Sequence, residues 1–276
     1  MVILAVSDVH IGYSNSNADA FDAFLKESIG RPDVGTLVIL GDCFDMWRRD
    51  VSGIFLENHE ILQSILAIKQ KKDVHYIVGN HDYHFLHLTD HNYPLVFEKD
   101  LTLQGDGIVY VFKHGWEFDD EQCPPVMEAL CDNLSDESGQ IRSDIWNVIT
   151  SVSQKTGQDF KLVEDVVKRN CGKFECIFER HRDEYLQRLI TPPVARVSVA
   201  FGSVEEKAAK SVETGQLLVF GHTHRPFVSP TQNLANTGSW ISDEKTFNTW
   251  VELDGKNIRL MQYGIGDITQ AMTKTI

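Results

Sequence analysis

The chain has 276 residues, a formal net charge of -14 and a pI of about 5.2. An acidic surface repels the phosphates of DNA and RNA, so nonspecific nucleic-acid binding is disfavoured, although a local basic patch would still permit it. Hydrophobic residues make up 42% of the chain, which is ample for a core, and the length fits one α/β domain with or without an insertion.

The sequence shows no secretory or membrane signal. Met1 leads straight into a predicted strand, and no apolar run approaches the roughly 20 residues of a membrane span. The cysteines are odd in number and form no Cys-x-x-Cys pair: Cys43, Cys123, Cys131, Cys171 and Cys176. We therefore expect a reduced, cytoplasmic protein, whose oligomeric state the sequence does not indicate.

The first part of the chain alternates predicted strands and helices. Short β-branched runs predict buried strands at 2–6, 36–40, 74–78 and 108–112. Apolar stripes predict helices at 19–29 and 55–70. The second stripe comprises Leu56, His59, Leu62, Ile65, Leu66 and Lys69, with Ile61 and Ile68 at its margin. This alternation favours βαβ units and a mostly parallel sheet.

The pattern changes after residue 117. Residues 118–213 are interpreted as a helical insertion, or cap, with helical stretches near 125–134, 139–155, 160–170 and 174–190. Strands are predicted again at 217–220, 227–229, 233–237, 247–253 and 257–262. The predicted core domain therefore consists of residues 1–117 and 214–263, with two stacked sheets flanked by helices, and residues 264–276 are expected to form a loose tail.

Five polar motifs each follow one of the predicted strands. They are Asp8-Val-His10, Gly41-Asp42-Cys-Phe-Asp45, Gly79-Asn80-His81-Asp82, His114-Gly115 and Gly221-His222-Thr-His224. In α/β sheets, ligands collect at the carboxyl ends of strands, where loops converge. Carboxylates, imidazoles and one amide, without thiolates, are typical of a two-metal hydrolytic site and favour Mn, Fe or Zn.

In this order, the motifs resemble those of the calcineurin-like metallophosphoesterase family, over residues 1–115 and 216–262. The resemblance implies a four-layer α/β/β/α sandwich, here with a helical insertion, and a hydrolase acting on phosphoric ester or pyrophosphate bonds. It also implies two divalent metal ions, with Mn²⁺ preferred and Fe or Zn as alternatives. A single aspartate or histidine after a strand is usually a capping or surface residue, but the full ordered set disfavours that interpretation.

The resemblance further implies a role for each motif residue. Seven residues would hold the metals, with Asp42 as the bridge: Asp8, His10, Asp42 and His224 for one ion, and Asp42, Asn80, His114 and His222 for the other. A hydroxide between the metals would attack phosphorus in line. His81 would protonate the leaving oxygen, and Asp82 would orient His81. Asp45 would hold a ligand histidine from the side away from the metal.

Other polar residues near the motifs have ordinary explanations beside the functional ones. Trp47, Arg48 and Arg49 could clamp a phosphate or stack on a base, but a partly exposed loop explains them nearly as well. Three histidines follow the third motif closely and are better explained as solvated or core residues than as ligands: His84, His87 and His91.

Within the family, the layout resembles the UDP-diacylglucosamine hydrolases of lipid A synthesis. The shared features are an aromatic-rich loop at 42–47, the helical insertion and the Gly-His-Thr-His-Arg-Pro run at 221–226. Those hydrolases typically carry arginine where this chain has His81, which argues against an identical substrate. The resemblance implies a phosphorylated small-molecule or lipid-linked substrate, with a nucleotide sugar as one candidate.

Three functions remain open at this point. A di-metal phosphohydrolase explains the ligands and His81, a nuclease is disfavoured by the acidic charge, and a non-catalytic scaffold of the same fold would usually have lost ligands. The apolar residues of the insertion could line a groove for a lipid or form the insertion's own core: Val126, Met127, Leu130, Leu134, Trp146, Val148, Ile149 and Val152.

Overall fold

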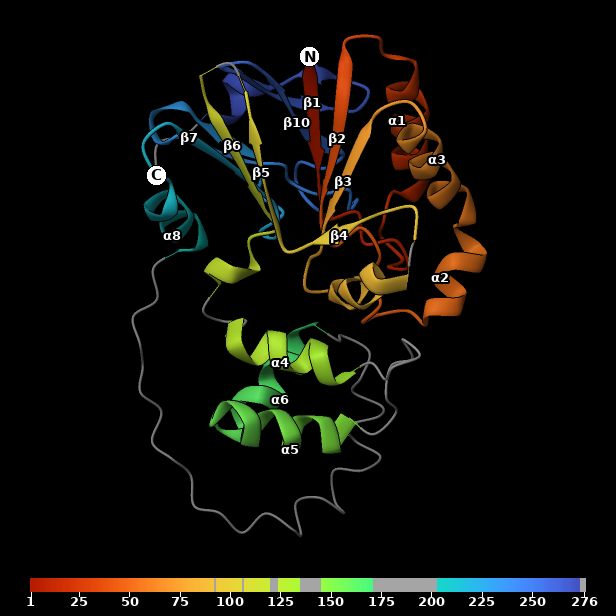
Figure 1. The fold of residues 1–276 in the computed structure, drawn as a ribbon, viewed down its shortest axis with the longest axis vertical. Coiled ribbons are helices and arrows are strands. Elements are labelled where there is room, and N and C mark those ends of the chain that lie inside the picture. The colour runs from red at the N-terminus through yellow and green to blue at the C-terminus, as the bar shows by residue number, and fades with distance from the viewer. Residues whose placement is uncertain (92, 106, 120–123, 135–144, 171–202, 274–276) are drawn as a thin grey trace. The chain divides into compact units, whose positions relative to one another are not determined.

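The computed structural model describes the chain except for residues 92, 106, 120–123, 135–144, 171–202 and 274–276 (Figure 1). The chain divides into two compact units. The core unit contains residues 1–119 and 203–276, and the helical unit contains residues 120–202. Among the described residues, no helix is both long and apolar enough to cross a membrane.

The larger sheet of the core unit has seven strands in the order β12-β11-β10-β1-β2-β3-β4. Four strands run parallel: β1 (Val2–Val6), β2 (Val34–Leu40), β3 (Asp73–Ile77) and β4 (Phe97–Glu98). Three antiparallel strands extend the other edge: β10 (Thr249–Asp254), β11 (Asn257–Gln262) and β12 (Gly266–Asp267). The central strand β1 pairs Ala5 with Val38 on one side and with Val251 on the other.

The smaller sheet has five strands in the order β5-β6-β7-β9-β8. They are β5 (Asp100–Gln104), β6 (Val109–Lys113), β7 (Gln216–Phe220), β8 (Phe227–Ser229) and β9 (Leu234–Asn236). The neighbours β6 and β7 are parallel, with Val111 opposite Leu218. The helical unit is therefore inserted in the connection between two strands that pair directly.

The two sheets pack face to face over a single apolar cluster. Alternate residues of each strand point into it because side chains along a strand alternate between faces. The buried members include Ala5, Val38 and Ile77 from the larger sheet and Phe112, Val219 and Ala235 from the smaller one. This cluster fixes the relative position of the strand ends from which the polar motifs emerge.

Helices cover the outer face of each sheet (Figure 1). On the larger sheet lie α1 (Ala18–Gly30) and α3 (His59–Lys69), and α1 buries Phe21 and Phe24 against the tryptophans Trp240 and Trp250. On the smaller sheet, α8 (Val204–Ser211) packs Ala208 into a second apolar cluster with Leu218, Phe220, Phe227 and Leu234. The predicted α/β/β/α architecture is confirmed.

The helix predicted over 55–70 is two helices, α2 (Val51–Glu57) and α3. Asn58 interrupts them, since its side-chain amide donates to the Ile54 carbonyl at 3.0 Å and its backbone leaves the helical region. The predicted apolar stripe is therefore correct only in part: Leu56 is 78% exposed, whereas Ile65 is buried as predicted. The apolar side chains that α3 buries are Ile61, Ile65 and Ile68.

Residues 264–273 belong to the segment expected to be a loose tail, but they form a strand and a 3₁₀ helix. Strand β12 pairs with β11 through Met261 and Asp267, and Ile268 and Met272 pack against the inter-sheet cluster. Helix α8, expected within the insertion, belongs to the core unit. The packing of Ile268 and Met272 therefore holds this segment against the core, although its composition gives no sign of a strand.

The helical unit contains α4 (Pro124–Leu134), α5 (Ile145–Thr156) and α6 (Phe160–Asn170). Each helix buries one apolar stripe, which includes Val126, Met127, Leu130, Ile149, Val152, Val163, Val166 and Val167. Of the two interpretations of these apolar residues, their burial favours the insertion's own core over an open groove. The helix predicted at 174–190 lies outside the described residues, as do the side chains of Leu134, Trp146 and Val148.

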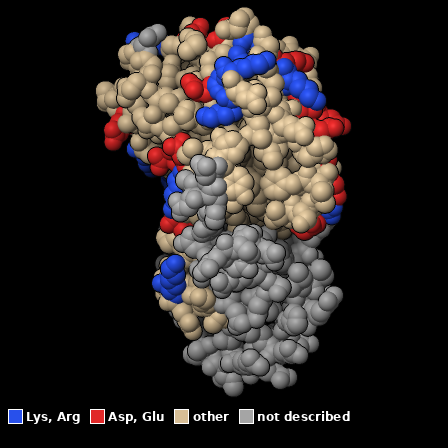
Figure 2. All heavy atoms as spheres, turned by 45° about the vertical axis from the view of Figure 1, so that its right-hand side comes forward, with Lys and Arg blue, Asp and Glu red and all other residues tan. Residues whose placement is uncertain are grey.

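Charged side chains are mixed on the face of the molecule drawn in Figure 2. Lys and Arg gather near the top of the core unit as drawn, with Asp and Glu beside them, so the described part of that face carries no unbroken basic surface. This distribution does not favour tight binding of nucleic-acid phosphates there.

Candidate metal centre

The five polar motifs meet at one edge of the two sheets. The first motif follows β1, the second follows β2 and the third follows β3, while the fourth and fifth follow β6 and β7 of the smaller sheet. Main-chain hydrogen bonds join neighbouring loops: Asp8 N donates to Gly41 O, His10 N to Asp42 O, and Gly221 N to His114 O, at 3.1, 2.8 and 2.8 Å. The motif loops therefore form one connected structure.

Five of the seven predicted metal ligands have left-handed backbone conformations. Asp8, His10, Asp42, His222 and His224 have φ values of 54°, 53°, 52°, 66° and 56°. Such angles are uncommon outside glycine and cost about 1–3 kcal/mol each. Strained backbone of this kind clusters at functional sites, where the surrounding structure holds it in place.

Three glycines allow the loops to approach one another. A Cβ on Gly79 would overlap both the main chain and the carboxylate of Asp42, and one on Gly41 would overlap the main chain of Gly79. A Cβ on Gly221 would overlap the Asp8 carboxylate. The glycines of the Gly-Asp, Gly-Asn and Gly-His motifs are thus required by close approach to the predicted ligands.

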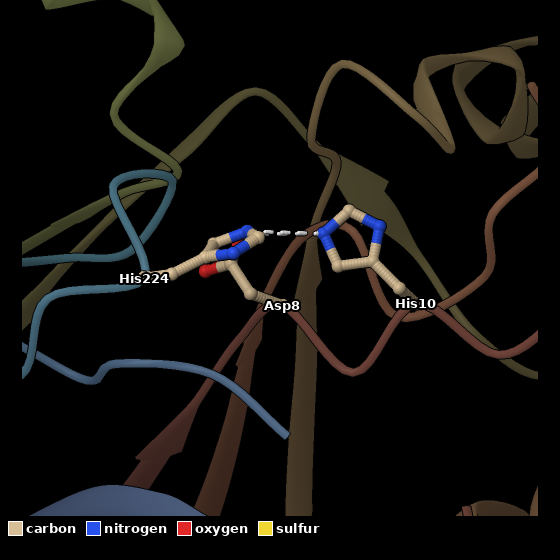
Figure 3. A group of neighbouring side chains, drawn as sticks. All are labelled: Asp8, His10 and His224. Atoms are coloured by element: carbon tan, nitrogen blue, oxygen red, sulfur yellow. Dashed lines mark hydrogen bonds and ion pairs between the residues drawn. The ribbon is translucent and has the colours of Figure 1, made fainter. Parts of the chain in front are cut away.

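The first group of candidate ligands is Asp8, His10 and His224 (Figure 3). The Nε2 atoms of His10 and His224 are 3.2 Å apart, and Asp8 Oδ1 lies 3.4 Å from His224 Nε2 and 3.8 Å from His10 Nε2. Nitrogen ligands about 2 Å from one ion lie roughly 3 Å from each other. The three donor atoms therefore converge as they would around a single ion.

The second group is Asp42, His114 and His222. His114 Nε2 lies 3.3 Å from Asp42 Oδ2. The same carboxylate oxygen lies 3.8 Å from His10 Nε2 of the first group, so Asp42 stands between the two groups, where a bridging ligand is needed. Asn80 is also buried at this edge, and its main-chain carbonyl accepts a hydrogen bond from the Trp47 indole at 2.7 Å.

Each histidine of the two groups is fixed through one ring nitrogen. Nδ1 of His10 lies 3.0 Å from Asp45 Oδ2, and Nδ1 of His114 lies 2.5 Å from the Leu40 carbonyl. Nδ1 of His224 lies 3.3 Å from Glu244, and Nε2 of His222 lies 3.0 Å from Asp119. Metal-ligating histidines commonly donate their second N–H to such oxygens. The sequence motifs give no sign of Asp119 or Glu244.

Burial and charge pairing shift the pKa values in the site. Burial would raise the pKa of Asp42, but the positive charges of His114 and then His81 outweigh burial and hold that pKa below its ordinary value. Burial would lower the pKa of His10, yet its hydrogen bond to Asp45 helps to raise it to about 10. The pKa of His114 is likewise raised to about 10, against burial, by Asp42. Imidazolium charges thus balance the carboxylates in the metal-free protein.

The donor set fits divalent metal ions. Two fully buried polar atoms, Asp8 Oδ1 and His114 Nε2, make no hydrogen bond within the described part of the chain. A buried polar atom normally has a hydrogen-bond partner or coordinates an ion. Carboxylate and imidazole donors without thiolate suit Mn, Fe or Zn.

A sequence model of the calcineurin-like phosphoesterase family matches residues 1–226. The chain belongs to this family. Similar solved structures include a novel archaeal phosphodiesterase, with 13% identity over 95% of this chain and 99% of that one and a TM-score of 0.41. A dimetal phosphatase from Danio rerio has 14% identity over 96% and 99%, with a TM-score of 0.42. Vps29 from Chaetomium thermophilum has 12% identity over 94% and 85%, with a TM-score of 0.37. No curated protein matches the chain.

In this calcineurin-like phosphoesterase, the carboxylate that contacts His81 is Asp45, not Asp82. Asp45 Oδ1 lies 2.9 Å from His81 Nδ1, while its other oxygen contacts His10. Asp45, His10 and His81 also lie close enough to hold an ion, but both rings present Nδ1 to opposite oxygens of one carboxylate, as hydrogen-bonded pairs do. Asp45 therefore links a predicted metal ligand to the predicted acid.

Asp82 instead fastens two loops of the phosphoesterase core together. It accepts hydrogen bonds from Gly79 N at 2.7 Å, Cys43 N at 2.9 Å and the Tyr76 hydroxyl at 2.5 Å. Burial, followed by the charge of Asp42, raises the pKa of Asp82 to about 6. The prediction that Asp82 orients His81 is wrong because its carboxylate faces these donors.

The loop that follows Asp45 is mostly structural. Trp47 is buried and uses its indole N–H on a main-chain carbonyl, and Arg49 pairs with Glu57 at the surface. These contacts give Trp47 and Arg49 structural roles, and their predicted role in substrate binding stays a prediction. Arg48 does border the site, since its guanidinium contacts the Asp45 carboxylate and lies 4.8 Å from the centre of the Tyr13 ring.

The remaining predicted residues take ordinary places or lie outside the description. His84 is buried, and the side chains of His87 and His91 are outside the described residues. The buried Asn236 supports the last motif of the family site, because its amide donates to Gly221 O at 2.7 Å and to Thr223 Oγ1 at 3.2 Å.

Proposed function

We propose that this chain is a hydrolase that uses two divalent metal ions to cleave a phosphate ester or pyrophosphate bond. The observation that carries the proposal is the pair of compact ligand groups with Asp42 between them. Membership of the calcineurin-like phosphoesterase family supports a metal-dependent phosphoesterase. Mn²⁺ is the ion we propose first, with Fe or Zn as alternatives that the same donors accept.

The residues present divide the work as follows. The first group would hold one ion, the second group, with Asn80, would hold the other, and Asp42 would be shared between them. Bound there, the ions would polarise phosphoryl oxygens and activate a water molecule. The fixed ring nitrogens keep the histidines in one tautomer, so their ligand nitrogens are already aimed.

His81 is the proposed proton donor to the leaving oxygen. Its Nδ1 is held by Asp45 at 2.9 Å, and its Nε2 lies 3.9 Å from Asp42 Oδ2, at the edge of the second group. A carboxylate on Nδ1 stabilises the protonated ring and leaves the Nε2 proton to be donated. The side chain is buried, so bulk water has little access to that proton.

For the substrate, we propose a phosphorylated small molecule or a lipid-linked phosphate, with a nucleotide sugar as one candidate. The intact ligand set and the acidic charge support this choice over a nuclease or a scaffold.

Turnover after chelator stripping and Mn²⁺ addition tests the proposal. We would compare bis-p-nitrophenyl phosphate, p-nitrophenyl phosphate and a UDP-sugar, and expect Mn²⁺ to restore cleavage of at least one. Asp42→Asn should lose both metal binding and turnover. His81→Ala should keep its metal content and lose about 10²–10⁴-fold in rate. A wild-type chain that binds two ions per molecule and cleaves none of the three probes would count against a catalytic role in favour of a scaffold.

A further inference from the structure

One of the four histidines in the two ligand groups is held by the opposite ring nitrogen. His10, His114 and His224 are fixed through Nδ1, which directs Nε2 to the ligand groups. His222 is fixed through Nε2, which lies 3.0 Å from Asp119 Oδ2. The nitrogen of His222 that remains for a metal is therefore Nδ1.

The main chain of His222 is anchored independently of its ring. Its backbone N–H donates to Asp8 Oδ2 at 2.8 Å, and its ring lies edge-on to that of His114, with centroids 5.3 Å apart. The left-handed backbone of His222 fixes the direction in which the side chain leaves the loop. With the main chain and Nε2 both held, the ring has little freedom to exchange its two nitrogens.

Asp119 lies on the same short segment as a ligand of the second group. A 3₁₀ helix (Trp116–Phe118) follows His114 almost directly, and Asp119 N donates to the Trp116 carbonyl at 3.0 Å. The first residue of this turn region, Gly115, donates its N–H to Glu117 at 2.8 Å. One tight turn thus carries a metal-ligand candidate at its start and the contact to His222 at its end.

We propose that Asp119 is a positioning residue that holds His222 with a proton on Nε2 and a lone pair on Nδ1 for the second ion. A carboxylate can only accept from an imidazole N–H, which places the proton on the nitrogen facing Asp119. The role rests on the proposed function, because it concerns one of the two metal sites.

Amide substitutions test which nitrogen faces the ion. The side-chain amide of asparagine occupies the position of histidine Nδ1, and that of glutamine approaches Nε2. Mn²⁺ titration calorimetry should show that His222→Asn keeps tighter binding at the second site than His222→Gln. The order should reverse at His224, where Nε2 faces the ligand group. A tighter His222→Gln variant would overturn the assignment.

A charge-matched pair tests the carboxylate. Asp119→Asn should weaken the second Mn²⁺ by about 10–100-fold and leave the first unchanged. Glu117→Gln removes the same charge from the same turn without touching a histidine, and it should leave both ions unchanged. Equal Mn²⁺ affinities in these two variants would overturn the role of Asp119. If Asp119→Asn fails to fold, the His222 pair still decides the question.

The wild-type titration separates this inference from the proposed function. A wild-type chain that binds no Mn²⁺, Fe²⁺ or Zn²⁺ would refute the metal site, and with it any role for Asp119. Two bound Mn²⁺ ions in the wild type, together with an unaffected Asp119→Asn variant, would refute only the positioning role.

Discussion

Replacement of Asp45 by asparagine should separate the two histidines that this carboxylate holds. Asp45 Oδ1 accepts from His81 Nδ1 and from the main-chain N–H of Arg48 at 3.0 Å. Oδ2 accepts from His10 Nδ1 and from the Arg48 guanidinium. An amide has one acceptor, so one of these pairs of donors must face an NH₂ group in the variant.

The structure indicates which pair loses its acceptor. The main-chain N–H of Arg48 cannot move away, whereas its side chain is 25% exposed and can turn into solvent. The amide oxygen should therefore take the Oδ1 position, and His10 should face the NH₂ group. To accept from it, His10 must have no proton on Nδ1, so any proton on the ring must sit on Nε2, the nitrogen that faces the first ligand group.

The expected result is a weaker first metal site with a partly preserved acid. The Mn²⁺ concentration for half-maximal rate should rise by about 10–100-fold. At saturating Mn²⁺ the loss of rate should be smaller than the roughly 10²–10⁴-fold loss expected for His81→Ala. Steady-state kinetics over a Mn²⁺ series measures both quantities. Unchanged Mn²⁺ dependence with a rate as low as that of His81→Ala would refute the reasoning.

Asp82→Asn is the matched comparison for this experiment. The Asp82 carboxylate accepts from the main-chain N–H groups of Cys43 and Gly79 and from the hydroxyl of Tyr76 on β3, none of which belongs to a histidine. One of them would face an NH₂ group in the variant, at a cost of about 1–3 kcal/mol in the free energy of unfolding. The melting temperature should fall, and the rate at saturating Mn²⁺ should change less than in Asp45→Asn.

Four further outcomes are expected. Because His10 and His114 have pKa values raised to about 10, Mn²⁺ binding at pH 8 should release about two protons per chain, seen as a buffer-dependent heat in titration calorimetry. The same raised values stabilise the metal-free fold below about pH 6.5, and this contribution is lost as the pH rises through 10; urea unfolding that is flat over that range would contradict it. Gly79→Ala should destabilise the protein by about 1–3 kcal/mol in the same urea titration, because the added Cβ would overlap Asp42. Gly30→Ala should be neutral or slightly stabilising, because nothing lies within 4 Å of the added Cβ. Glu244→Gln should weaken the first Mn²⁺ by about tenfold, since this half-exposed carboxylate fixes only the last histidine of the motif; Mn²⁺ titration that matches the wild type would contradict it.

Local patterns were sufficient to predict the strands and to locate the motifs. β1 has the predicted bounds, and β2, β3 and β7 differ by a few residues at their ends, because buried β-branched runs need little context. Three strands were not predicted: β4 and β12 have only two residues each, and β5 has a weaker apolar pattern. The sequence analysis predicted one continuous helix over 55–70, but α2 ends at Glu57 and α3 begins at His59. The side-chain hydrogen bond of Asn58 lies at this break, which no apolar pattern indicates.

The partners of the histidines could not be read from the sequence. Asp119 and His222 are 103 residues apart, and Glu244 follows His224 by 20 residues without a recognisable motif. The family resemblance led to the prediction that Asp82 orients His81, but the two neighbouring side chains have different partners, Tyr76 for Asp82 and Asp45 for His81. Contacts of this kind depend on how the strands are paired, which no short pattern specifies.

The position of the helical unit has a consequence for the entropy of the chain. Strands β6 and β7 pair directly. The chain between them, which includes the helical unit, can therefore be treated as a polymer loop whose two ends are held together by that pairing. The free energy of closing a loop rises only with the logarithm of its length, by about 0.6 kcal/mol for each doubling. His114 and His222, which flank that loop, are therefore held at a spacing that hardly depends on how much chain lies between them. Insertions and deletions within residues 120–202 should therefore change the free energy of assembling the ligand groups by only about 0.6 kcal/mol for each doubling or halving of the length.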